Sequence, residues 1–173
     1  MYLKFIGCIL IIFGSTLIGF IYGENLKKRV QQLQELERVI YQLQNEIMYT
    51  HTPLPEIFIH AGEKCDKPIG EIFLEVSKLL LKNEVDNVYC AFNQVLKCNK
   101  SLLDLKDDDI KIILNLAKAL GETDIDGHKN IISLTLLNLK KQIKNAEEIM
   151  NKNVKMYRYL GFSFGAILAI MIV

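Results

Sequence analysis

The chain has 173 residues and a formal net charge of only +1, so no strong overall field favours binding to nucleic acid. It contains no tryptophan and only three prolines. No run of alternating apolar residues borders an Asn-Gly or Asp-Gly hairpin turn, and the fold class that we expect is therefore all-α.

Residues 5–23 form an apolar segment without a charged side chain, between Lys4 and Glu24. A helix needs about 20 apolar residues to cross the hydrocarbon core of a bilayer. The alternative is a cleaved signal peptide, but few basic residues precede the segment and no A-x-A-like cleavage site follows it. We therefore expect residues 1–23 to be an uncleaved transmembrane helix.

Residues 24–49 predict a long amphipathic helix that continues the first apolar segment, because they contain no Gly or Pro. Their apolar residues recur at intervals of three and four, which is close to the spacing of a coiled coil. These residues are Leu26, Val30, Leu33, Leu36, Ile40, Leu43 and Ile47. The prolines at 53 and 55 end this helix, and Thr52 is expected to cap the next one.

Four shorter helices are expected in the middle of the chain, separated by polar stretches at residues 62–68 and 98–101. Their apolar faces begin with Leu54, Ile57, Phe58 and Ala61; then Ile69, Ile72, Phe73, Val76, Leu79 and Leu80; then Val85, Val88, Tyr89, Phe92, Val95 and Leu96; and last Ile110, Ile113, Leu114, Ala117 and Leu120. Helical spacing of these residues predicts amphipathic helices that pack on one another.

Three consecutive aspartates, Asp107 to Asp109, are expected in the first turn of the fifth helix, where negative charge complements the helix dipole. A divalent cation would need further oxygen ligands in loop geometry, and none is apparent. Gly121 is expected to end this helix as the residue just past it, and Asp124 to cap the sixth.

The sixth helix is expected to run from residue 125 to residue 158 and to lead into a second apolar segment, residues 159–173. Its stripe consists of Ile132, Leu136, Leu139, Ile143, Ala146, Met150 and Val154. The apolar segment is somewhat short for a bilayer, but Tyr157, Arg158 and Tyr159 suit the interface. The alternative is a buried core helix. We expect insertion, which divides the chain into an anchor (1–23), a helical domain (24–158) and a second anchor (159–173).

Basic residues lie beside both apolar segments on the side of the helical domain. They are Lys27, Lys28 and Arg29 after the first and Lys152, Lys155 and Arg158 before the second, whereas only Lys4 lies on the other side. The positive-inside bias therefore predicts a cytoplasmic domain with both termini outside.

Small residues recur at four-residue intervals in both apolar segments. They are Ser15, Gly19 and Gly23 in the first and Gly161, Gly165 and Ala169 in the second. Such faces allow close approach of helices. Counted from the cytoplasmic side, the three residues of each segment match in order, which predicts antiparallel packing of the two anchors; a chance distribution of glycine is the alternative. We also expect a two-helix stalk with the second to fifth helices as a bundle at its far end.

No catalytic, cofactor or metal site is expected. Cys8, Cys65, Cys90 and Cys98 have no C-x-x-C spacing, and with His60 they would form a metal site only by accident of folding. The G-x-S-x-G, H-E-x-x-H and P-loop motifs do not occur. These observations argue against an enzyme.

Three stretches, in chain order, resemble motifs of the stage III sporulation protein AB family. The most specific is the turn after the first long helix, which is similar to E-I-x-Y-x-x-T-P-L-P-E-x-F. Its matching residues include Glu46, Tyr49, Thr52, Pro53, Leu54, Pro55, Glu56 and Phe58. Residues 120–124 resemble L-G-x-S/T-D and residues 155–161 resemble K-M-Y-R-x-L-G. Gly127 and His128 depart from the acidic and Gln residues that are more usual in the family.

The resemblance implies a platform of the channel between mother cell and forespore, in the mother-cell membrane. Its soluble part would be similar to the F-domain of the type II secretion platform protein. It would dock a cytoplasmic secretion-type ATPase, stage III sporulation protein AA, and contact other channel components and the lipid bilayer. The turn at residues 46–58 is then a candidate partner surface, with a plain helix break as the alternative. The alternative function is a membrane-anchored scaffold or signalling stalk unrelated to sporulation.

Overall fold

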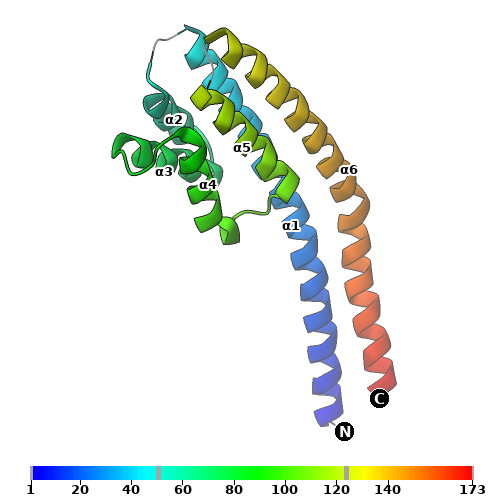
Figure 1. The fold of residues 1–173 in the computed structure, drawn as a ribbon. Helices are drawn as coiled ribbons and strands as arrows, with labels where there is room; N and C mark the ends of the chain where they lie inside the picture. The colour runs from blue at the N-terminus through cyan, green and yellow to red at the C-terminus, as the bar shows by residue number, and fades with distance from the viewer. Residues whose placement is uncertain (1, 50–51, 123–124, 173) are drawn as a thin grey trace. The chain divides into compact units, whose positions relative to one another are not determined.

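The computed structural model describes the chain except residues 1, 50–51, 123–124 and 173; within the helices, the side chains of residues 2–12, 122, 125–126, 158, 161–162, 164–166 and 168–172 are also left undescribed. The described elements are helices throughout (Figure 1). They are α1 (Tyr2–Tyr49), α2 (Leu54–Glu63), α3 (Ile69–Leu81), α4 (Val88–Cys98), the 3-10 helix η1 (Lys100–Leu102), α5 (Asp107–Glu122) and α6 (Ile125–Ile172). The expected all-α class is confirmed.

The chain divides into two compact units that share α1 and α6. The core unit runs from Gln31 to Lys144, and the terminal unit consists of the chain up to Val30 and from Asn145 onward. As predicted, α1 continues from the apolar segment into the amphipathic stretch without a break, and α6 continues in the opposite order.

In the core unit, α1 and α6 are neighbours. The Nζ atom of Lys140 lies 5.4 Å from the centre of the Tyr41 ring and 4.0 Å from a carboxylate oxygen of Glu37. The predicted stripes of both helices face inward, because Leu33, Leu43, Ile132 and Leu139 are all buried. The expected pairing of these two long helices is therefore confirmed in this unit.

Three phenylalanines from three helices form the centre of the smaller bundle. The rings of Phe58 on α2, Phe73 on α3 and Phe92 on α4 lie 5.2 to 6.0 Å apart and meet edge to face. This geometry is favoured because the positive edge of one ring meets the negative face of another. All three side chains are buried, so the cluster joins α2, α3 and α4 into one core.

The bundle lies alongside α1 and not at the far end of a stalk, which corrects the prediction. The side-chain amide of Gln32 donates to the carbonyl of Leu102 at 3.4 Å and accepts from the amide of Asp104 at 2.9 Å. The amide of Asp66 donates to Glu35 at 3.1 Å. The α2–α3 and α4–α5 connections are thus hydrogen-bonded to the part of α1 where the core unit begins. A bundle at the far end of a stalk would not contact this part of α1.

Two predicted helix ends are wrong. The N-cap of α2 is Pro53, whose backbone is extended, and not Thr52. The helix can begin directly after Pro53 because Pro55 is tolerated in the first helical turn. Gly121 is helical within α5, and none of the described glycines has a positive φ, so it does not end the helix as a left-handed residue. The expected cap at Asp124 lies outside the described residues.

The start of α4 also differs from the prediction. Val85 precedes the helix, and the side chain of Asn87 accepts a hydrogen bond from the amide of Cys90 at 2.9 Å as the N-cap. At α5 the three aspartates do occupy the first turn, and Asp109 accepts from the amide of Lys106 at 2.9 Å. This bond closes the first turn in the manner of a capping box.

In the terminal unit, the described side chains of α1 and α6 meet at two positions. The rings of Tyr22 and Tyr157 stack with their centres 5.8 Å apart. A methyl group placed on Gly23 would lie 3.6 Å from Val154. Among the fully described residues, no helix meets the length and hydropathy of a membrane span. Much of the two apolar segments falls on residues whose side chains are not described.

Candidate functional site

The turn between α1 and α2 holds the residues that resemble the family motif, and the structure divides them into two groups. Phe58 belongs to the buried aromatic cluster, and the carbonyl of Pro55 accepts a hydrogen bond of 2.8 Å from the buried hydroxyl of Ser77. These residues fasten the turn to α3. Tyr49, Pro53 and Glu56 are exposed, whereas Thr52 and Leu54 are half-buried.

Glu46 ties the end of α1 to α2 through its two carboxylate oxygens. One lies 2.7 Å from the side-chain amide of Gln42, which donates to it, and the other lies 3.0 Å from Nδ1 of His60. Burial raises the pKa of Glu46, but the hydrogen bonds from Gln42 and His60 and the nearby charges of His60 and Lys64 outweigh it. The pKa therefore falls below 4.5 and the carboxylate stays charged at neutral pH.

Residues of the motif turn therefore connect α1 to α2 and α2 to α3 within the fold. Of its eight predicted residues, Glu46, Pro55 and Phe58 make the contacts described above, whereas Tyr49 is 81% exposed. A tyrosine that is exposed to this degree contributes little to the core. The outward side of the turn, with Tyr49, Pro53 and Glu56, is the part that is open to a partner.

Two glycines that the sequence analysis did not single out hold α2 and α3 at their closest approach. A methyl group on Gly70 would lie 2.5 Å from the carbonyl oxygens of both Cys65 and Gly62, and one on Gly62 would lie 2.8 Å from the carbonyl of Gly70. No side chain fits there without moving backbone. Gln32 was also missed, because nothing in the sequence separates it from the neighbouring Gln31 and Gln34 and only the fold buries it.

The small-residue face of the first apolar segment points inward as far as it is described. Gly19 and Gly23 are buried and Ser15 is half-buried, whereas Gly14 is exposed with nothing within 4 Å of an added methyl group. Around this face, six large apolar residues are 49–67% exposed: Phe13, Leu17, Ile18, Phe20, Ile21 and Tyr22.

The partner face in α6 cannot be compared in the same way. The described atoms nearest to Gly23 belong to Val154 and not to Gly161, which was its predicted match. Gly161, Gly165 and Ala169 themselves lie outside the residues with described surroundings. Their packing against the first segment stays a prediction.

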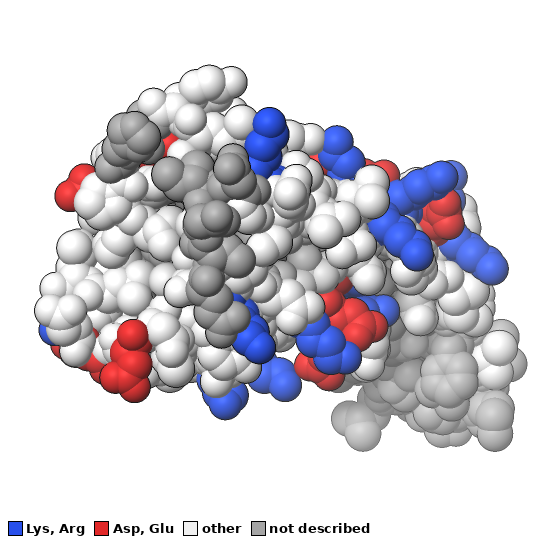
Figure 2. Space-filling view, turned by 45° about the horizontal axis from the view of Figure 1, so that its top comes forward, with Lys and Arg blue, Asp and Glu red and all other residues white. Residues whose placement is uncertain are grey.

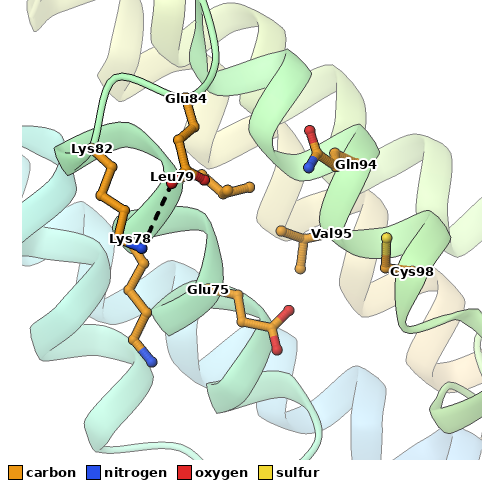
Figure 3. Close-up of a pocket in the computed structure, with 8 residues that line it drawn as sticks. All are labelled: Glu75, Lys78, Leu79, Lys82, Glu84, Gln94, Val95 and Cys98. Carbon is orange, nitrogen blue, oxygen red and sulfur yellow. Dashed lines mark ion pairs between the residues drawn. The ribbon is translucent and has the colours of Figure 1, made fainter.

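A cavity of about 270 Å³ lies between α3 and α4. Figure 3 shows Leu79 and Val95 among the residues that line it, together with charged side chains, of which Lys82 and Glu84 are paired at 3.6 Å. Cys98 also lines it and is exposed. No group of three or more His, Cys, Asp or Glu residues suited to a metal ion occurs in the described part of the chain.

The cysteines of the core unit differ in their environment. Burial, together with the negative charge of Glu35, raises the pKa of the Cys65 thiol to about 11. The thiol of Cys65 is therefore protonated and unreactive at neutral pH. Cys98 is exposed and open to reagents.

Charge is mixed on the face that Figure 2 draws. Lys and Arg side chains lie there beside Asp and Glu side chains, separated by uncharged surface. The described residues of this face do not form the continuous basic stripe that is typical of nucleic-acid binding.

Comparison with known proteins gives the family. The profile described as Stage III sporulation protein AB (spore_III_AB) matches residues 4–173, almost the whole chain. The chain belongs to the stage III sporulation protein AB family. Stage III sporulation protein AB of Bacillus subtilis (strain 168) is 29% identical over 170 residues, covering 98% of this chain and 99% of that protein.

A solved structure of stage III sporulation protein AB (SpoIIIAB) has the same fold. It superimposes with a TM-score of 0.66 at 28% identity and covers 71% of this chain and 96% of that one. The family places the chain in sporulation, and the resemblance first seen in the turn at residues 46–58 is confirmed.

Proposed function

We propose that this member of the stage III sporulation protein AB family is a non-enzymatic membrane platform of the channel between mother cell and forespore. The observation that carries the proposal is the family match along residues 4–173. The core unit would face the cytoplasm and dock the secretion-type ATPase of the same channel, stage III sporulation protein AA. The two ends of the chain would anchor it in the mother-cell membrane, with both termini outside.

The described part of the first apolar segment supports the membrane anchor. Large apolar side chains such as Phe13 and Leu17 point outward there, while Gly19 and Gly23 are buried. In water this arrangement would expose a large apolar surface. In a bilayer it is favourable, because lipid surrounds the large side chains and small residues let the helices approach.

The core unit supports a docking role because its functional features are surfaces and not reactive groups. The contacts of Glu46 and Pro55 fasten the described residues before and after positions 50–51 to α2 and α3, and Tyr49 and Glu56 are exposed there. Exposed aromatic residues are common at the centres of protein interfaces. We therefore assign the outward side of this turn as the surface that meets the ATPase.

Docking is tested by measuring binding of the full chain, in mild detergent, to the ATPase of the same channel. The double variant Tyr49→Ala/Glu56→Lys should weaken binding at least tenfold, or about 1.4 kcal/mol. Leu102→Ala, at a residue of η1 that is 56% exposed, is the control and should bind like the wild type. Absence of binding by the wild-type chain would refute ATPase docking. Full binding by the double variant would place the contact elsewhere.

Membrane topology is tested with the natural thiols. A membrane-impermeant maleimide should leave Cys98 unlabelled in intact sporangial protoplasts and label it after permeabilisation. Cys65 should resist labelling in both samples, because its thiol is half-buried and protonated. Labelling of Cys98 in intact protoplasts would contradict a cytoplasmic core unit. The alternative of a scaffold or signalling stalk unrelated to sporulation is disfavoured by the family match.

A further inference from the structure

The outer face of α6 in the core unit carries two leucines where a surface helix normally carries polar residues. Leu134 is 60% exposed and Leu137 is 66% exposed, and residues three apart are neighbours on a helix surface. The opposite face of the same stretch is buried through Ile132, Leu136 and Leu139. The helix is thus apolar on two sides, and one of them is uncovered.

Two lysines extend this uncovered face. Lys141 follows Leu137 by four positions and Lys144 follows Lys141 by three, so all four residues share one side of the helix. Both lysines are exposed, and neither makes an ion pair with a described residue. We call Leu134, Leu137, Lys141 and Lys144 the α6 strip.

A second exposed patch lies at the connection between α3 and α4 and carries two carboxylates beside one exposed lysine, Lys82. It consists of Leu81, Glu84, Asp86 and Tyr89, which we call the loop patch; all four are exposed. Glu84 makes only an exposed ion pair with Lys82, and no ion pair of Asp86 with a described residue is found. The loop patch therefore combines apolar side chains with carboxylates that are open to a cation.

The backbone holds the loop patch in one conformation. Asn83 has a φ of 53°, the left-handed region, and its amide bonds the carbonyl of Leu80 at 3.1 Å. The amide of Glu84 bonds the carbonyl of Leu79 at 3.1 Å. These two bonds form a Schellman motif, which closes the end of α3 in an ordered turn. The patch is therefore displayed by a fixed turn.

The loop patch also borders a hollow of about 480 Å³ that has room for a leucine side chain. Asn87 and Tyr89 line it on the side of α4, and α5 supplies Asn115, Ala117, Lys118 and Gly121. An apolar side chain that entered this hollow would be covered by Tyr89 and Ala117.

The two patches lie on different sides of the core unit, as Figure 1 shows: α6 is on one side and the α3–α4 connection on the other, with α1 and α5 between them. They cannot meet within one chain. We propose that the α6 strip of one copy docks on the loop patch of a second copy. Lysines then meet carboxylates, and leucines meet Tyr89, Leu81 and the hollow. Because the two surfaces differ, the contact is head to tail and builds a ring or a row of copies.

Charge reversal with mixing tests the proposal on the full chain in mild detergent at low salt. The strip variant is Lys141→Glu/Lys144→Glu, and the loop variant is Glu84→Lys/Asp86→Lys. Each alone should associate at least about tenfold more weakly than the wild type, because like charges meet across the contact. An equimolar mixture should associate again, with every contact joining a strip variant to a loop variant, which sedimentation of differently labelled copies detects.

The control variant Lys97→Glu/Lys100→Glu also replaces two exposed lysines by glutamate, but near the C-terminal end of α4 and outside both patches. It should associate like the wild type. The variant Leu134→Asn/Leu137→Asn, which leaves all charges in place, should also weaken association. A wild-type chain that stays monomeric up to roughly 100 μM would overturn the proposal. Association that both reversals leave unchanged would also overturn it, because another contact, such as one between the apolar termini, would then hold the copies together. A mixture that stays monomeric would overturn it as well, because the two patches would then not meet.

Discussion

The core unit and the terminal unit arrange their side chains in opposite ways. In the core unit, large aromatic residues such as Phe58, Phe73 and Phe92 are buried, although Leu134 and Leu137 on α6 are exposed. In the described part of the terminal unit, Phe13 and Leu17 lie outside and Gly19 and Gly23 are buried. Burial of apolar surface from water stabilises the first arrangement. The second leaves large apolar side chains uncovered, as expected for the membrane anchor proposed above.

Glycine shows the same difference at closer range. In the core unit, Gly70 lies where backbone meets backbone, and an added methyl group would overlap two carbonyl oxygens at 2.5 Å. In the terminal unit, a methyl group on Gly23 would be in ordinary contact with Val154 at 3.6 Å. The core unit is therefore fixed by exact backbone contacts, whereas the terminal pair has room for small changes.

The largest test of the comparison replaces one phenylalanine in each unit. Phe73→Ala should lower the free energy of unfolding by about 3–5 kcal/mol, because it opens a cavity in the aromatic cluster. Phe13→Ala, at a residue that is 67% exposed, should change it by less than about 0.5 kcal/mol. Denaturant unfolding of the purified full chain, followed by circular dichroism, measures both. Equal losses would show that the two units bury their apolar residues alike.

The next test concerns the close approach of α2 and α3. Gly70→Ala should destabilise the core unit by about 2–3 kcal/mol, since the new methyl group forces backbone to move. Gly121→Ala is the matched control: it is helical with free space around it, and it should stabilise α5 by about 0.5–1 kcal/mol. Denaturant unfolding followed by circular dichroism measures the free energy of unfolding of both variants. A neutral Gly70→Ala variant would contradict the tight contact.

A third test enlarges the side chain at the contact between Gly23 and Val154 in the terminal unit. Gly23→Leu should weaken the pairing of α1 and α6 there by about 1–2 kcal/mol, because the larger side chain meets Val154. The readout is disulfide crosslinking of Tyr22→Cys with Tyr157→Cys in membranes, after the native cysteines are replaced by serine.

Gly14→Leu is the control for this third test, because nothing lies near an added methyl group at Gly14. Gly23→Ala should also keep the crosslink, since 3.6 Å is an ordinary contact. An unchanged yield with Gly23→Leu would show that this contact does not hold the helices together.

The smallest effect is the pH dependence of the stability that Glu46 contributes. Its pKa is lowered in the folded chain, so its stabilisation is present above the pKa of the unfolded chain and is lost as the pH falls through the folded value. Unfolding between pH 7 and pH 3 should therefore show a loss below about pH 4.5, of under about 1 kcal/mol. Glu46→Gln should reduce this slope. A slope that is the same in wild type and variant would assign the loss to other carboxylates.

Local sequence patterns determined the helices, because the period of apolar residues and the prolines at 53 and 55 act on neighbouring residues. The long stripes of α1 and α6, the first turn of α5 and the family itself could be predicted from them. The caps were less predictable, as Pro53 and Gly121 show, because a helix end is set by one or two hydrogen bonds that compete closely.

Only the tertiary structure decided how the helices are joined. It placed the bundle alongside α1 through Gln32, brought Gly62 and Gly70 into contact, and showed that Phe58 is core while Tyr49 is surface. It also left Leu134 and Leu137 uncovered on the outer face of α6. The physical reason is that such contacts join residues far apart in the chain, and their distances depend on how whole helices pack. The apolar period fixes which residues are able to be buried, but not what each one meets.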